Sequence, residues 1–144
     1  MFGRDKRPPQ PSPVQAEDDA PPGEAEKVEQ VKRLCWIAGM SAVYLNPASE
    51  DYQTLADAPE QQEYERNRYN EFRAKALRVA DEITDEFFQS AAIHFIIDAS
   101  MKAGDDDDAR ALLKHVEVDF IRGKIEAGYP HLKRPKLSSL VRQP

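Results

Sequence analysis

The chain has 144 residues, of which 26 are Asp or Glu and 20 are Lys or Arg, so its formal net charge is −6. This length accommodates one ordinary domain but not two. The acidic balance argues against nucleic-acid binding by the folded part, because that binding depends on Lys and Arg releasing counterions. The single cysteine excludes an intrachain disulfide, and no apolar run approaches the ~20 residues of a membrane span. We therefore expect a cytoplasmic protein that does not enter the membrane.

Residues 1–23 form a segment rich in proline and charge, with almost no large apolar side chain after Phe2. Such a composition cannot bury enough apolar surface to offset the entropy of ordering, so we expect a disordered tail. Its basic residues are not followed by an apolar run, which argues against a secretory signal.

A first helix is predicted from about Glu24 to Leu45, where apolar and small residues recur at steps of three and four. Asn46 and Pro47 end it, because proline cannot continue a helix. The second half of this helix is apolar nearly all round. The residues that add the second apolar face are Trp36, Ile37, Met40, Val43 and Tyr44.

A helix that is apolar on every side must be covered on every side. Either this helix is the central one of a bundle, or its second face packs against another chain. We favour a partner surface, because no helix of a three-helix domain is fully enclosed. Trp, Tyr and Met are also enriched at protein interfaces.

The segment from Pro59 to Ala103 contains no internal Gly or Pro and begins with an apolar stripe at helical spacing. A short helical turn is expected in the connection before it, and Asp57 is the expected N-cap, with Pro59 in the first turn. An unbroken helix of this length would extend about 67 Å at ~1.5 Å per residue, which is too long for a compact domain of this size. The members of the stripe are Tyr69, Phe72, Ala76, Val79 and Ile83.

The regular spacing fails after Ile83, where two interpretations stay open. Thr84 could cap a new helix, with Ile83 and Phe88 forming a hydrophobic staple across the cap. Alternatively the helix continues with a shift of phase, since neither Gly nor Pro forces a kink.

Gly104 is predicted to end this helix, and the four aspartates at 105–108 to open the next, which is expected from about Asp106 to Ala127. The aspartates lack the spaced oxygen ligands, the central Gly and the distal Glu of an EF-hand loop. Capping therefore explains them better than calcium binding. Gly128 and Pro130 end the last helix.

Two pairs of residues at i, i+4 spacing, His94 with Asp98 and His115 with Asp119, are candidate metal ligands. They support an alternative function as a metal-dependent helical oxidoreductase. However, di-iron bundles carry Glu-x-x-His on two helices. Ala91 and Leu112 stand where those glutamates would be. We therefore predict no metal and no cofactor.

Residues 129–144 are predicted to form a basic flexible tail. Docking of nucleic acid or of an acidic protein through this tail is a third hypothesis, although a solvated chain end explains the charges as well. The basic residues concerned are Lys133, Arg134, Lys136 and Arg142.

The sequence thus predicts an all-α protein, a three- to four-helix antiparallel bundle over residues 24–128 between two tails. No motif identifies a family or a catalytic site. The expected function is that of a small non-catalytic accessory protein. It would bind a protein partner, or a second copy of itself as a homodimer, through Trp36, Ile37, Met40, Val43 and Tyr44.

Overall fold

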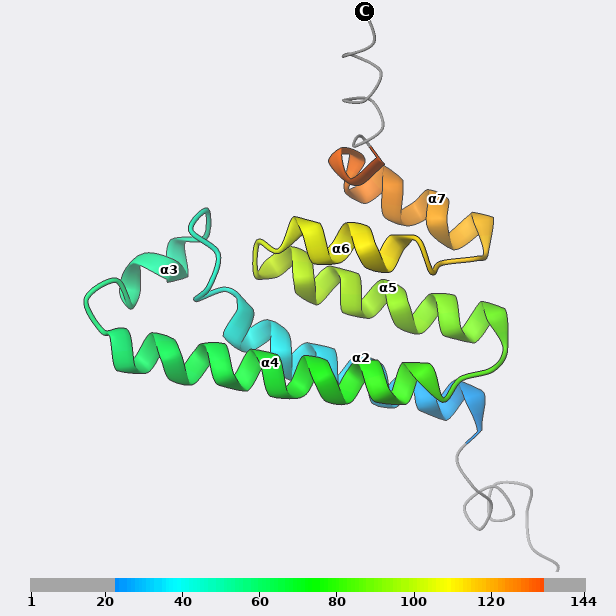
Figure 1. Cartoon of the computed structure of the whole chain (residues 1–144), viewed down its shortest axis with the longest axis horizontal. Coiled ribbons are helices and arrows are strands. Elements are labelled where there is room, and N and C mark those ends of the chain that lie inside the picture. Colours follow the sequence, from blue (N-terminus) through cyan, green and yellow to red (C-terminus); the bar gives the residue numbers. More distant parts are fainter. Residues whose placement is uncertain (1–22, 134–144) are drawn as a thin grey trace, which may run out of the picture.

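The computed structural model describes residues 23–133, and every regular element in this range is a helix. The all-helical prediction is therefore confirmed for the described part of the chain. Figure 1 shows the arrangement of the elements along the chain. Their bounds are α2 Glu24–Ala42, α3 Glu50–Thr54, α4 Pro59–Asp81, α5 Glu86–Lys102, α6 Asp106–Leu113, α7 Asp119–Gly128 and the 3-10 helix η1 Pro130–Lys133.

The three long helices α2, α4 and α5 pack against one another, and α2 makes its largest contact with α4 (Figure 1). The buried face of α2 consists largely of small residues at helical spacing, among them Cys35, Ala38 and Ala42. Small side chains at a contact allow helix axes to approach closely. The other helices contribute Tyr69, Ala76 and Ala80 from α4, and Ala92, Ile96 and Ala99 from α5.

A second apolar cluster lies on another face of α5 and joins it to α6, α7 and η1. Ile93 and Ile97 of α5 pack there with buried residues that include Val116 and Ile125. Helix α5 therefore belongs to both clusters, which explains why it is the most apolar of the long helices within residues 23–133.

The long segment is broken between Asp81 and Glu86, so the interpretation with two helices is correct. The N-cap of α5 is Asp85 rather than Thr84, and its carboxylate accepts a hydrogen bond from the Phe88 amide at 3.0 Å. Asp caps this site in the usual way, by satisfying an amide of the first turn that has no partner within the helix.

Two side chains from outside this loop hold it in place. Glu24 Oε1 accepts hydrogen bonds from the amides of Thr84 at 2.9 Å and of Asp85 at 2.8 Å. Gln89 Nε2 donates to the carbonyls of Ala80 at 3.2 Å and Ile83 at 3.0 Å, at the end of α4. Side chains of α2 and α5 thus provide hydrogen-bond partners for backbone amides and carbonyls in and next to this loop.

The turn between α5 and α6 confirms the capping interpretation of the aspartates. Gly104 has φ of +79°, and the Asp105 amide donates to the Ser100 carbonyl at 2.9 Å, as in a Schellman motif. The Asp105 carboxylate then accepts from the Asp108 amide at 3.2 Å and caps α6.

A polar cluster joins α4, α5 and α6. The Arg73 guanidinium on α4 forms an ion pair with Asp108 of α6, and the Ser100 hydroxyl of α5 donates to the same carboxylate at 2.8 Å. Arg73 Nε also lies 3.5 Å from Ser100 Oγ. The nearby Tyr69 hydroxyl is buried without a hydrogen-bond partner among the described residues.

The prediction of one helix from Asp106 to Ala127 is wrong, because the chain leaves helical geometry between Leu113 and Asp119. The buried Ser90 Oγ accepts hydrogen bonds from the amides of Glu117 at 3.2 Å and Val118 at 3.4 Å. These amides therefore find a partner on α5 instead of one within a helix. Phe120, at the start of α7, is 69% exposed.

Smaller differences concern the ends of elements. Helix α2 ends at Ala42 rather than Leu45, and the N-cap of α4 is Ala58 rather than Asp57. The packed part extends past the expected boundary at Gly128, because Leu132 of η1 is buried. The predicted tails at 1–22 and 134–144 lie outside the described residues.

Replacing Ser90 with Ala is expected to destabilise the protein by about 1–3 kcal/mol, because two amides lose their acceptor. Urea unfolding followed by circular dichroism measures this change. Ser41→Ala is the matched control, since Ser41 is equally buried but none of the side-chain hydrogen bonds within residues 23–133 involves it. Equal losses for the two variants would contradict the role given to Ser90.

Replacing Glu24 with Gln should weaken the pH dependence of stability. Hydrogen bonding from the Asp85 amide lowers the pKa of the Glu24 carboxyl in the folded state. A lowered pKa stabilises the fold above the unfolded value of about 4.3, and this contribution disappears as the pH falls further. Urea midpoints at pH 7 and pH 3.5 should differ less for Glu24→Gln than for wild type. Glu63→Gln on the exposed side of α4 should retain the wild-type dependence.

Candidate functional site

The predicted interaction residues lie on α2 and on the turn that follows it. Trp36 and Met40 are one helical turn apart and are 67% and 47% exposed. Ile37, Val43 and Tyr44 beside them are half-buried. We call these five residues the α2 patch. The structure thus places all five in one region of the surface, with Trp36 and Met40 the most exposed of them.

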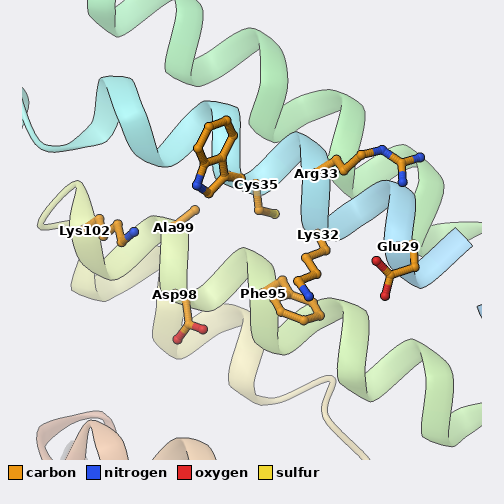
Figure 2. A pocket seen from close by; sticks show the side chains of 9 residues that line it. Glu29, Lys32, Arg33, Cys35, Phe95, Asp98, Ala99 and Lys102 are labelled. Atoms are coloured by element: carbon orange, nitrogen blue, oxygen red, sulfur yellow. The ribbon is translucent and has the colours of Figure 1, made fainter.

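Trp36 also borders a groove of about 390 Å³ between α2 and α5. Figure 2 shows side chains that line this space on the two helices: Lys32 reaches from α2 toward Phe95 of α5, whereas the Arg33 side chain extends away from α5. We call it the α2–α5 groove. Its lining consists of Glu29, Lys32, Arg33, Cys35 and Trp36 from α2, with Phe95, Asp98, Ala99 and Lys102 from α5.

The groove combines an apolar interior with a charged rim. Lys32 Nζ lies 5.8 Å from the centroid of the Phe95 ring, a cation–π contact, and Figure 2 shows this side chain extending from α2 toward α5. The aliphatic stem of Lys102 lies against Gly39, where an added Cβ would come within 3.4 Å of the Lys102 Cδ. Both ammonium groups therefore border apolar surface.

Asp98 connects the groove to the C-terminal part of the described chain. Its Oδ1 accepts a hydrogen bond from the Tyr129 hydroxyl at 2.8 Å and lies 3.8 Å from His94 Nε2. Burial, followed by the hydrogen bond to Asp98, raises the pKa of the Tyr129 hydroxyl. Tyr129 therefore stays protonated and donates to Asp98 throughout the neutral range.

Cys35 belongs both to the core and to the groove lining. Its side chain is buried, and burial raises the pKa of its thiol to about 12. A thiol that is protonated at neutral pH is a poor nucleophile and a poor metal ligand. Burial therefore disfavours thiol chemistry at Cys35.

Of the two pairs in the metal hypothesis, only His94 and Asp98 lie side by side. His115 and Asp119 lie on opposite sides of the break between α6 and α7, so they do not share a helix face. His115 borders a different cavity of about 300 Å³ with Asp81 and Gln89. Within residues 23–133, no three His, Cys, Asp or Glu side chains are placed to hold a metal ion.

Of the basic residues proposed for tail docking, only Lys133 lies in the described range. It is exposed, and its Nζ is 4.0 Å from Glu126 Oε1. Arg134, Lys136 and Arg142 lie outside the described residues.

The α5 side of the groove was not predictable from the sequence. Phe95 and Lys102 carried no signal of a shared site, because their position beside Trp36 depends on how α5 is rotated against α2. Phe95 lies in an apolar stretch of the sequence, which is typical of a core position rather than of a site.

Comparison with known proteins gave no match to a family model, to a curated protein or to a solved structure. Among the helices of the described range, none combines the length and the apolar character that crossing a bilayer requires.

The Cys35 thiol is expected to react slowly with Ellman's reagent in the native protein at pH 8. A pKa of about 12 instead of the ordinary ~9 lowers the thiolate fraction about a thousandfold, and burial slows access further. Absorbance at the dye wavelength measures the reaction with and without urea. Rapid labelling of the native protein would show that Cys35 is open to the groove and would contradict its burial.

Proposed function

We propose that this protein is a small, non-catalytic, cytoplasmic accessory protein that binds another protein, or a second copy of itself, through the α2 patch. The antiparallel bundle that we infer from α2, α4 and α5 would serve as a rigid support for this patch. The lone cysteine, buried as a thiol, supports a location where disulfides are not required.

The observation that carries this proposal is the distribution of side-chain size around α2. Its buried face uses Cys35, Ala38, Gly39 and Ala42, whereas Trp36 points to solvent. Exposing an indole ring forgoes roughly 1.5–3 kcal/mol of burial, as for other large apolar side chains. Packing within the described chain does not require Trp36, and an interface would bury it.

The adjoining exposed Met40 strengthens the argument. Single exposed apolar side chains are common on monomeric proteins and need no explanation. Here two large side chains lie one turn apart, with three half-buried apolar neighbours on the same surface. This grouping is typical of the centre of an interface, where Trp and Met are enriched.

The double variant Trp36→Ser and Met40→Ser tests the proposal. Both side chains are largely exposed, so the helical content should be retained and the free energy of unfolding should change by about 1 kcal/mol or less. Affinity capture from the native host, with mass spectrometry and light scattering, should show loss of a partner or of the oligomer.

The matched control is Tyr64→Ser with Phe120→Ser, which removes apolar side chains that are 54% and 69% exposed on α4 and α7. This control should retain the partner or the oligomer. Unfolding of the Trp36 and Met40 variant would show that these residues belong to the core. If the variant keeps the same partners and the same oligomer mass, the proposal is also contradicted, because the α2 patch would then have no role in association.

A further inference from the structure

We infer that the α2–α5 groove binds an acidic segment of a partner protein, one that presents a large apolar side chain flanked by Asp or Glu. This inference rests on the proposed function and specifies the chemistry of the partner. It is supported by the shape of the groove, by the charges around it and by its continuity with the α2 patch.

The interior of the groove calls for an apolar group. Cys35 and Ala99 line it with small apolar side chains, while Trp36 and Phe95 add aromatic surface. Its volume of about 390 Å³ falls in the range of ~300–1,000 Å³ that is usual for ligand sites. Aromatic side chains at such a site contribute large contact areas at a low entropic cost.

The rim favours negative charge in the occupant. Three cations, Lys32, Arg33 and Lys102, border the groove, and none has a carboxylate within 4 Å among residues 23–133. Of the two acidic residues in the lining, Asp98 already accepts a hydrogen bond from Tyr129. Together with Glu29, the lining therefore holds three cations against two carboxylates, and its formal charge is +1.

This local charge contrasts with the chain as a whole, whose net charge is −6. Screening limits electrostatic interactions at the surface to about 8–10 Å at physiological salt. The nearby lysines and arginine, not the net charge, therefore decide which segment fits the groove. A basic segment would meet like charges there, which is costly.

The continuity with the α2 patch points to a protein segment rather than a small molecule. Trp36 lines the groove and also neighbours Met40, one turn further along α2. An occupant that fills the groove can therefore continue along the exposed side of α2. A small molecule would leave Met40 uncovered.

Trp36 is the only tryptophan of the chain, so its fluorescence reports on the groove and on the adjoining α2 patch. We would select a random dodecapeptide display library on the immobilised full-length chain and synthesise the enriched sequences that lack Trp. The inference predicts that these peptides carry Asp or Glu beside a large apolar residue. Their binding should shift the Trp36 emission to shorter wavelength.

The double charge reversal Lys32→Glu and Lys102→Glu should weaken the selected peptides at least tenfold while the circular dichroism spectrum is retained. Lys114→Glu with Lys124→Glu gives the same change of net charge at exposed sites outside the lining, and it should leave the affinity within about twofold. Equal weakening by both double variants would overturn the inference, since a general charge effect would then explain the binding.

Other outcomes are also decisive. Enriched peptides that are basic or uncharged but still need Trp36 would overturn the acidic partner and leave the proposed function standing. Trp36 emission that depends on protein concentration alone would assign the groove to a second copy. If reversing the charges of Glu17, Asp18 and Asp19 changes the Trp36 emission of the full chain without peptide, the groove would be assigned to this chain's own acidic segment. If no peptide binds and the Trp36 and Met40 variant keeps every partner, both proposals fail.

Discussion

The ion pair between Arg73 and Asp108, with Ser100 donating to the same carboxylate, is the interaction on which the arrangement of the helices depends. It joins one residue from each of α4, α5 and α6 in a partly buried setting. A charged pair in such a setting is costly to break, since removing one partner leaves the other unpaired. The cluster thereby restricts the rotation and the axial position of α5, which contributes four of the nine residues that line the groove.

Two of the connections between helices follow the same principle, because each is held by polar side chains from neighbouring helices. Glu24 and Gln89 satisfy the loop between α4 and α5, and Ser90 satisfies the loop between α6 and α7. Each of these side chains holds its loop through hydrogen bonds and not through apolar packing. The register of helices with many small buried residues is thus set by polar contacts, while apolar burial supplies most of the stability.

The sequence predicted those features that depend on local patterns and missed those that depend on distant contacts. The break before α5 was visible as a slip in apolar spacing after Ile83, and the Gly104 turn was visible from its residue types. The break before α7 was invisible, because Leu112, Val116 and Phe120 continue the helical spacing and only Ser90 on another helix reveals the interruption. The exposure of Trp36 could be anticipated from the second apolar face of its helix. The groove could not, since it requires the rotation of α5.

The small buried residues of α2 and its large exposed ones have one physical cause. Ala38 and Gly39 allow α4 and α5 to approach α2 closely, and such a contact leaves no room for an indole. A large side chain on this helix therefore has to face outward or line the edge between helices, as Trp36 does. Enlarging the core to admit Trp36 would separate α2 from α5 and abolish the groove. Close packing inside and an apolar surface outside consequently have the same origin, and we expect the stability of the helical core to depend little on the exposed side chains of Trp36 and Met40.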